Sequence, residues 1–539
     1  MKKKIPLIKV PIWVYYIVAV VEGGCLMTVE LSTAKIIEPV YGNTLLVWAS
    51  VLGVTLAGLA FGYFVGGRLI DKLRLNKILF IILMNASLLM VVMLACAQHF
   101  LKTPNFDNIG FSVFISALII IFPSVLFMGM VGPILVQMIT RKIKESGKIT
   151  GRVYAISTLS GIAMTFFLGF FLLPEIGITK TITGAACLLG LIPLVTLVIR
   201  KRMLLWTGLF LVAFTLVSFH NLSDDHINRK DFSITYQSES LFGQVKVIDE
   251  TQTVMYTSGG SNQVQIRKLF LNGTGQTCAL KNQPDYSLWP YVHRINVLSS
   301  IKPPGSKALI IGFGGGSVAS ELIKQGFKVD GLDIDGRMFE IARDYFSFDL
   351  TVLDNQYVDD ARHFINITDE KYDIIIIDIL NGEIHPFQIF TIECFTKIGK
   401  MLNQDGIVII NYQSNLYDQE KSLGARSIYK TIQATGFNIR HWFFMESQRN
   451  FGDLIMLCSK EQIDYSKLSP NRLRKCCRDL INLNQLFTEE RIILDDAIVL
   501  YDNYPMLDIL SRPITEIWRK ESNRAIMNQY QNYDIPLFN

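Results

Sequence analysis

The stretch ALIIGFGGGS, residues 308–317, passes from a short apolar strand directly into a glycine-rich turn. Residues 318–325 then read as a helix, and a second apolar strand ends at Asp333. Glycines let a ligand approach the backbone, and the N-terminus of the following helix favours polar or negative groups. An acid at the tip of the second strand is well placed to accept hydrogen bonds from ribose hydroxyls. This layout is typical of an adenosine-binding site.

Strands and helices alternate on both sides of this turn. Apolar strands are predicted at 307–311, 328–332, 373–377 and 406–411, with a short one near 351–353, and helices at 317–325, 336–346, 360–366 and 388–403. Such a series predicts a doubly wound, largely parallel sheet, whose ligands bind beyond the carboxyl ends of the strands. The residues at those ends are Gly312 to Gly316, Asp333, Asp359-Asp360 and Asp378. Together they favour an adenosine-type cofactor site over an unrelated nucleotide site.

Structural interpretations of the same residues stay open. Asp333 and Asp360 would each suit the N-terminal cap of the helix that follows. Asp378 could be a strand-end acid oriented by the backbone of its turn. His293 and His363 read as packing or surface residues rather than as catalytic groups.

The first 220 residues have a different character. The chain is 50% hydrophobic and only 18% charged, which is unusual for a soluble protein of this length. Runs long enough to span a bilayer lie near 11–31, 46–66, 78–98, 112–132, 153–173, 180–199 and 203–220, so about seven transmembrane helices are expected. Lysine and arginine gather on alternate loops, which places the N-terminus in the cytoplasm of a multi-pass cell-membrane protein. The net charge is +5, and the positively charged residues cluster in these loops beside the apolar runs. This distribution indicates membrane orientation rather than nucleic acid as a partner.

Two features of the apolar half leave questions. Seven spans would put the C-terminal half outside the cell, whereas an adenosine-type sulfonium cofactor is made in the cytoplasm. Either one run is re-entrant or interfacial, or the C-terminal half faces outward. Glu22 and Glu30 lie inside or at the edge of the first span, where a carboxylate indicates either a cation pathway or a local bond to a neighbouring helix.

The predicted organisation therefore has four parts. These are a membrane domain at 1–220, a small β-domain with a lead-in helix at 221–300, a Rossmann-like domain at 301–465, and a helical tail at 466–539 that packs on the α/β domain. The fold class is a polytopic α-helical membrane domain plus an α/β Rossmann-like, methyltransferase-type domain with a small N-terminal β-region. None of the eight cysteines has a spacing typical of a zinc site, so no metal is expected.

The ordered motifs of the C-terminal half resemble the spermidine synthases (polyamine aminopropyltransferases), and specifically the membrane-fused spermidine synthase-like proteins. The motifs are SLFGQVKV at 240–247, LFLNG at 269–273, the glycine turn, LDID at 332–335, VDDAR at 358–362, YDIIIID at 372–378 and YDNYP at 501–505. In the apolar half, EPVYGN at 38–43 and GGRLID at 66–71 are similar to the fused pattern. The likeness covers nearly the whole chain.

The resemblance implies a role for each matched residue. Gly312, Gly314 and Gly316 would line the cofactor's amino-acid side, Asp333 would bind its ribose, Asp360 would accept from the adenine amino group with Ala361 beside it, and Asp378 would be the catalytic base. Gln276 and Glu383 would lie on the substrate side. The co-substrate would be decarboxylated S-adenosylmethionine, and the acceptor a polyamine such as putrescine. The implied activity is membrane-bound aminopropyl transfer in polyamine and spermidine biosynthesis, with a homodimer as an open alternative to a monomer.

Three positions depart from the family pattern. Soluble members carry aspartate where this chain has Gly315, a second carboxylate where it has Asn381, and a Tyr-Gln pair where it has Phe242-Gly243. Because polyamines and their aminopropyl donors are cations, fewer carboxylates weaken the attraction for them. Two alternatives therefore remain: an S-adenosylmethionine-dependent methyltransferase, and a non-catalytic transporter or sensor that binds adenosine compounds or polyamines.

Overall fold

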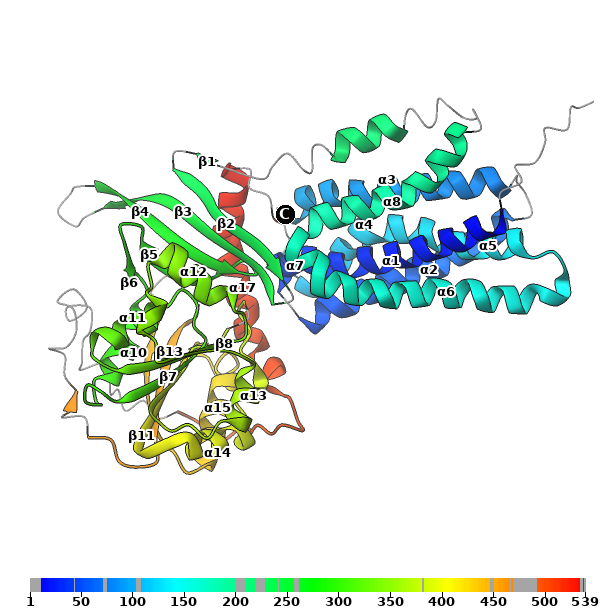
Figure 1. Ribbon diagram of the computed structural model, residues 1–539. Coiled ribbons are helices and arrows are strands. Elements are labelled where there is room, and N and C mark those ends of the chain that lie inside the picture. Colours follow the sequence, from blue (N-terminus) through cyan, green and yellow to red (C-terminus); the bar gives the residue numbers. More distant parts are fainter. Residues whose placement is uncertain are drawn as a thin grey trace, which may run out of the picture. The chain divides into compact units, whose positions relative to one another are not determined.

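A computed structural model describes residues 11–42, 44–70, 75–102, 108–199, 210–218, 228–229, 231–240, 242–255, 261–380, 382–445, 450–464, 467–468, 492–533 and 537. The chain divides into two compact units. The first unit consists of Met1–Ile227, Gln237–Gln244 and Ala525–Asn539, and the second of Asn228–Tyr236 and Val245–Arg524. Figure 1 colours both units along the chain.

Helices make up the described core of the first unit. They are α1 (Ile12–Tyr41), α2 (Leu45–Leu69), α3 (Leu75–Leu101), α4 (Ile109–Gly129), α5 (Val131–Ile139), α6 (Ser146–Phe167), α7 (Leu173–Ile176) and α8 (Ile178–Ile199). A 3₁₀ turn, Ile143–Glu145, precedes α6, and a π-helical turn, Leu168–Leu172, follows it. Helix α1 packs against α6 and α8, and α2 packs against α4 (Figure 1).

Small residues allow two of these helix pairs to approach closely. A Cβ atom built on Gly62 of α2 would lie 2.5 Å from the Leu126 carbonyl oxygen of α4. A Cβ atom built on Gly23 of α1 would lie 2.1 Å from the Ser157 carbonyl oxygen of α6. Only glycine fits at these two points, as is common where membrane helices pack tightly.

Six helical stretches in the described part of the chain are long and apolar enough to cross a membrane. They cover Ile12–Tyr41, Leu45–Leu69, Lys77–Leu101, Ile109–Ile139, Ile143–Ile176 and Ile178–Thr196. These correspond to the first six predicted runs. The seventh, 203–220, lies partly outside the described residues, which show a helix only over 210–218.

An antiparallel sheet of six strands in sequential order follows the helices along the chain, and most of its residues belong to the second unit. The strands are β1 (Asn228–Arg229), β2 (Phe232–Ser240), β3 (Gly243–Met255), β4 (Ser261–Leu271), β5 (Thr274–Leu280) and β6 (Gln283–Ser287). The turn Asn272-Gly273, which has positive φ at both residues, joins β4 to β5 as the sequence predicts. Val245, Val247 and Leu269 form a core with Met338 and Ile341 of the helix α12 (Arg337–Phe346).

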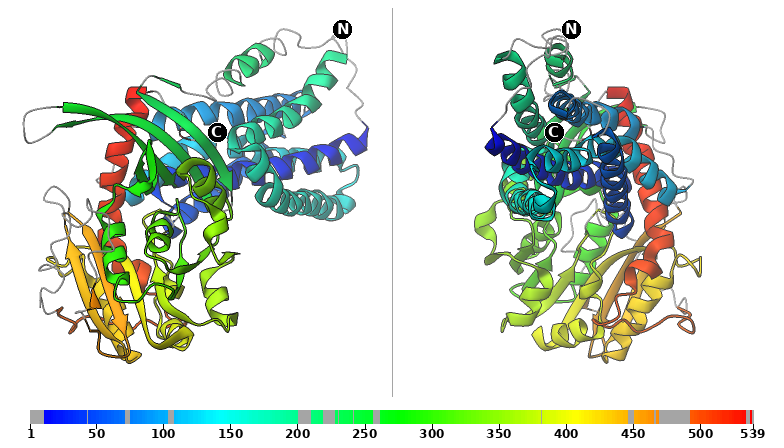
Figure 2. Two further views of the ribbon diagram at one scale, coloured as in Figure 1. Left: turned by 60° about the vertical axis from the view of Figure 1, so that its left-hand side comes forward. Right: turned by 90° about the vertical axis from the view of Figure 1, so that its right-hand side faces the viewer.

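A seven-stranded sheet follows, in the order β12-β13-β11-β10-β7-β8-β9. Its strands are β7 (Lys307–Ile311), β8 (Lys328–Asp333), β9 (Asn355–Val358), β10 (Tyr372–Ile377), β11 (Leu402–Ser414), β12 (Asn438–Phe444) and β13 (Gly452–Ser459). Pairing is parallel from β9 to β11, whereas β13 is antiparallel to both of its neighbours, so the sheet is mixed. Figure 2 shows the yellow and orange strands side by side at one end of it.

Helices cover both faces of this sheet. Alternate strand residues such as Ala308, Ile310 and Ile376 point toward α10 (Pro290–Ser299), α11 (Ser317–Lys324) and α12. The intervening residues, such as Leu309 and Ile377, pack with α13 (Ala361–Ile367), α14 (Ile392–Met401) and α15 (Leu423–Ala434). Because successive strand side chains face opposite ways, apolar runs buried on both faces produce two cores.

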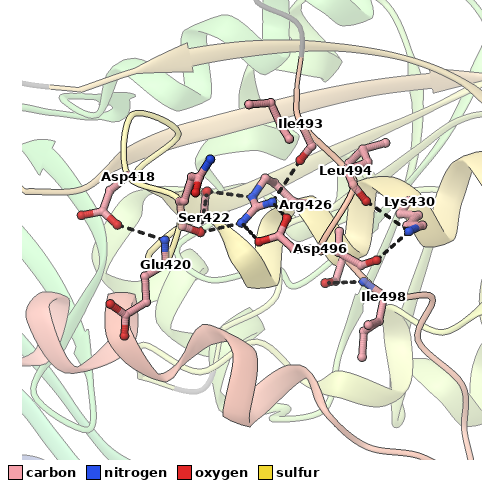
Figure 3. A network of polar contacts seen from close by, with 12 residues as sticks. Asp418, Glu420, Ser422, Arg426, Lys430, Ile493, Leu494, Asp496 and Ile498 are labelled. Carbon is pink, nitrogen blue, oxygen red and sulfur yellow. Dashed lines mark hydrogen bonds and ion pairs between the residues drawn. The ribbon is translucent and has the colours of Figure 1, made fainter.

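The chain beyond the last strand returns to α15. Arg426 forms an ion pair with Asp496 and donates to the Ile493 carbonyl oxygen at 3.0 Å (Figure 3). Lys430 donates to the carbonyl oxygens of Leu494 and Ala497 at 3.1 and 2.6 Å. These bonds hold the segment that leads to the last helix, α17 (Leu507–Tyr533). Part of the predicted tail, 469–491, lies outside the described residues.

Candidate active site

The glycine turn and Asp378 meet where the strand order reverses. The chain runs from β7 outward to β8 and β9, and then crosses back to β10 on the other side of β7. A Cβ atom built on Gly312, at the end of β7, would lie 2.1 Å from the Asp378 carbonyl oxygen at the end of β10. A switch point of this kind is where open α/β sheets bind their ligands.

The turn itself depends on glycine. Gly312, Gly314 and Gly316 have φ of 93°, 52° and 76°, a region that residues with a Cβ atom rarely adopt. Gly315 donates its backbone N–H to the Thr277 Oγ1 at 3.0 Å, and a Cβ atom there would lie 2.8 Å from the Thr277 side chain. The turn is therefore pinned to β5 and presents backbone rather than side chains.

Asp333 lies at the end of β8, beside the turn. Its carboxylate accepts the backbone N–H groups of Phe313 and Asp335, each at 2.9 Å. Burial raises the pKa of Asp333 to about 6, against the opposing effect of these hydrogen bonds. The alternative in which Asp333 caps the next helix is wrong, because α12 starts at Arg337 and the accepted N–H groups precede it.

Asp360 follows β9 and does cap a helix. Its Oδ1 accepts the backbone N–H of His363 at 2.9 Å, so the capping interpretation is confirmed. Ala361 is the first residue of that helix and is half-buried. A carboxylate has two oxygens, so capping leaves Asp360 able to accept a further hydrogen bond. Its contact with an adenine amino group stays a prediction.

Asp378 is held by groups that sequence reasoning did not single out. Asn411, on β11, donates its Nδ2 to the Asp378 Oδ1 at 2.9 Å. Burial raises the pKa of Asp378 to about 6, while hydrogen bonds from Asn411 and Tyr291 oppose the shift. Burial and the neighbouring Asp378 raise the pKa of Tyr291 well above its usual value. A buried carboxyl group at a strand end whose pKa is raised to about 6 is a candidate general base, and the catalytic role of Asp378 stays a prediction.

Gln276 is the clearest polar group without a partner at this edge. The residue lies on β5, and its backbone oxygen would be 3.9 Å from a Cβ atom on Gly314. Its Nε2 is buried and finds no hydrogen-bond partner among the described residues. Buried donors are nearly always paired in a folded protein. The free amide therefore fits a ligand that supplies an acceptor.

The loop after Asp378 is held internally. Glu383 forms an ion pair with Arg519 of α17, and both side chains are buried. His385 is stacked on Tyr412 at 4.1 Å between ring centroids, and burial lowers its pKa to about 4, so the imidazole is neutral at physiological pH. The structure thus brings Glu383 to a cation of its own chain rather than leaving it open to substrate. Asn381 lies outside the described residues.

The two histidines that the sequence assigns to packing or to the surface lie in such positions. His293 is buried, with its Nε2 2.8 Å from the Ser287 carbonyl oxygen, and His363 is exposed, with its Nδ1 2.7 Å from Asp359. In the described part of the chain, no group of three or more His, Cys, Asp or Glu residues could hold a metal ion.

Tyr291, Asn411 and Thr277 are the site residues that sequence reasoning missed. Asn411 had a signal, because it is a polar residue that ends the apolar run of its strand. Tyr291 and Thr277 had none, since they come from α10 and β5, which precede the glycine turn in the chain.

The part of the chain that contains these residues is similar to a known protein family. Residues 295–465 match the family model described as a spermine/spermidine synthase domain. This part of the chain is therefore similar to spermine/spermidine synthase domains. The match begins within α10 and ends after β13, so it includes the glycine turn, Asp333, Asp360 and Asp378.

Individual relatives agree with this domain assignment. The chain is 28% identical over 207 residues to the polyamine aminopropyltransferase of Vibrio vulnificus, covering 36% of this chain and 65% of that protein. It is 25% identical over 431 residues to polyamine aminopropyltransferase 2 of Aquifex aeolicus, covering 76% of this chain and 80% of that protein. An N-terminal histidine N-methyltransferase of Emericella nidulans is 24% identical over 241 residues, 43% of each chain. The first and third of these matches thus span 65% and 43% of the relatives' lengths.

Proposed function

We propose that the protein transfers an aminopropyl group from decarboxylated S-adenosylmethionine to a polyamine such as putrescine. The observation that carries the proposal is Asp378, a carboxyl group with a pKa near 6 that abuts the glycine turn of a spermine/spermidine synthase domain. Relatives named polyamine aminopropyltransferase support the same reaction.

The proposed step is a single displacement. The neutral amine nitrogen of the acceptor attacks the aminopropyl carbon bound to the sulfonium, and a carbon–nitrogen bond forms. The carbon–sulfur bond breaks with its electron pair on sulfur, which leaves neutral methylthioadenosine. The proton lost from nitrogen passes to Asp378. Placing the reacting atoms in line and removing this proton are the main contributions that a protein can make.

Each residue at the strand ends has a proposed task. Gly312, Gly314 and Gly316 give the donor access to the backbone, while Asp333 accepts its ribose hydroxyls and Asp360 its adenine amino group, beside Ala361. Gln276 supplies a side-chain donor or acceptor on the substrate side, which agrees with its unpaired Nε2. The ion pair with Arg519 gives no support for amine binding by Glu383.

The first unit is proposed to hold the protein in a lipid bilayer. With a cytoplasmic N-terminus, the six candidate spans of the described residues would return the chain to the cytoplasm, where the donor is made, whereas a seventh crossing at 203–220 would place it outside. The domain limits proposed are 1–220 for the membrane part, 221–300, 301–465 and 466–539. A reporter fused after Asn539 would test the side: a cytoplasmic signal supports an even number of crossings, and an external signal contradicts it.

Methyl transfer from S-adenosylmethionine is the second candidate. The similarity to an N-terminal histidine N-methyltransferase favours it, as does Gly315, which places no carboxylate side chain beside the donor. The two reactions differ in the nucleoside that they release, namely methylthioadenosine or S-adenosylhomocysteine.

Product analysis tests the proposal. The full chain in detergent would be incubated with putrescine and each sulfonium donor in turn, with Asp378→Asn as the control. Methylthioadenosine from the decarboxylated donor, absent with the variant, is the expected result. Release of S-adenosylhomocysteine instead would transfer the assignment to methyl transfer, and binding without turnover of either donor would contradict both reactions.

A further inference from the structure

Helix α1 carries three acidic side chains that are buried inside the first unit. Glu22, Glu30 and Glu38 are 7%, 9% and 2% exposed. The proposed reaction uses none of them. A carboxylate within a membrane-crossing helix is expensive to maintain and, in most cases, serves ion binding, proton movement or substrate binding.

The three carboxylates differ in their partners. Glu38 accepts from the Lys35 Nζ at 2.8 Å, so it is neutralised by an alkylammonium group of its own helix. Glu22 accepts from the Ser157 hydroxyl at 3.0 Å, and two tyrosines, Tyr63 and Tyr154, lie within electrostatic range. Glu30 makes no hydrogen bond or ion pair with any residue that the structure describes. Among the described residues, Glu22 and Glu30 therefore have no cationic partner.

The spacing of these two residues indicates how long a cation must be to pair with both. Eight residues of α-helix separate Glu22 from Glu30, a rise of about 12 Å along the axis and a rotation of about 80° beyond two full turns. Both side chains therefore lie on the same half of α1. A linear triamine with a four-carbon and a three-carbon spacer has nine bonds between its end nitrogens. At roughly 1.2 Å per bond of an extended chain, those nitrogens are about 11 Å apart.

We propose that Glu22 and Glu30 form a second binding site, within the helical unit, for a linear triamine cation such as spermidine. One terminal ammonium group lies at each carboxylate, in the same kind of pair that Lys35 makes with Glu38. The choice of a polyamine rests on the proposed function, whereas the choice of a cation rests on two buried carboxylates that have no cationic partner among the described residues. A shorter diamine reaches only one of them.

The test counts bound spermidine. Labelled spermidine is dialysed to equilibrium against the full chain in zwitterionic nanodiscs, with protein-free discs as a blank. Two spermidine molecules per chain are expected, one at the catalytic site and one in the helical unit. Glu22→Gln and Glu30→Gln, which preserve side-chain volume, should each bind one. Glu145→Gln, at an exposed acid of the same unit, should bind two.

Competition by a shorter amine and a parallel measurement of turnover provide two further checks. Putrescine should compete at the Glu30-dependent site at least about tenfold more weakly than spermidine, because it forms one charge pair instead of two. One spermidine per wild-type chain, or two per Glu30→Gln chain, would overturn the inference, as would equal competition by putrescine or sodium. Methylthioadenosine release is followed on the same samples. If the wild type binds spermidine in a Glu30-dependent manner but releases no methylthioadenosine, the proposed reaction is refuted and this site is not. If it releases methylthioadenosine but shows no Glu30-dependent binding, this site is refuted and the reaction is not.

Discussion

The hydrogen bond from Asn411 to Asp378 gives the most quantitative prediction. It joins the Asn411 Nδ2 to the Asp378 Oδ1 at 2.9 Å and favours the ionised carboxylate. A hydrogen bond to a charged group is worth about 1.5–3 kcal/mol, and one pKa unit corresponds to about 1.4 kcal/mol. Asn411→Leu, which keeps the number and branching of the side-chain heavy atoms, should therefore raise the pKa of Asp378 by roughly one to two units above its value of about 6.

The sign of the effect on activity follows from the role of a base. Asp378 must be ionised to accept a proton, so kcat/KM rises as pH increases through about 6 in the wild type. In Asn411→Leu this acidic limb should move to roughly pH 7–8, so that activity at pH 7 falls about twofold to tenfold and largely recovers near pH 9. The titration of the acceptor amine is common to both enzymes and does not shift.

Asn403 offers a matched control for this experiment. It lies on the same strand, β11, and donates its Nδ2 to the Asp373 Oδ1 at 2.7 Å, at the opposite end of β10. Asn403→Leu therefore removes an equivalent bond without touching Asp378, and its pH–rate profile should match the wild type. An unshifted limb in Asn411→Leu, or an equal shift in both variants, would refute the reasoning.

Three other changes have definite outcomes. Asp378→Asn should lower turnover about 10²- to 10⁴-fold while sparing donor binding. In the wild type, a carboxyl pKa that is raised in the folded state destabilises the fold as pH rises from about 4 through about 6. The variant lacks this group, so it should unfold at a higher temperature than the wild type at pH 8, and the difference should vanish near pH 4. Arg519→Met leaves Glu383 charged and buried and should destabilise the second unit by about 3–5 kcal/mol, measured as a lower temperature of half-inactivation. Adding Glu383→Leu to the same chain should recover part of this loss. Unchanged stability of the single variant Arg519→Met would contradict the ion pair. Gly312→Ala places a Cβ atom at positive φ and against the Asp378 backbone, so it should abolish donor binding. The control Gly305→Ala has a similar φ of 89° but no atom within 4 Å of the new Cβ. It should lower the free energy of unfolding by only about 1–2 kcal/mol and bind donor normally.

The central strands of the seven-stranded sheet were predictable because they are apolar runs that end in glycine or aspartate. Strands β7, β8 and β10 lie within a residue of their predicted limits. The short third strand is displaced to β9, because 350–352 form a 3₁₀ turn. The antiparallel strands β12 and β13 were not anticipated. Strand β12 mixes polar and aromatic residues, and the sequence between β12 and β13 has no Asn-Gly or Asp-Gly hairpin signal.

The candidate site was predictable as far as chain order determines it. Parallel strands bring their carboxyl ends to one edge, so the glycine turn, Asp333, Asp360 and Asp378 could be grouped from the sequence. Partners from other elements could not. Glu383 was predicted to face substrate, but it pairs with Arg519, 136 residues later in the chain. Such a pair depends on how α17 packs, which local patterns do not encode.

Formation of spermidine is the most direct test of the proposed reaction. In a single turnover, the full chain would receive one equivalent of decarboxylated S-adenosylmethionine and excess putrescine, and both products would be measured by mass spectrometry. Aminopropyl transfer at Asp378 predicts methylthioadenosine and spermidine in equal amounts, and Asp378→Asn should form both at least about 10²-fold more slowly. Methylthioadenosine without an aminopropylated amine, or equal amounts of both products from Asp378→Asn, would contradict it.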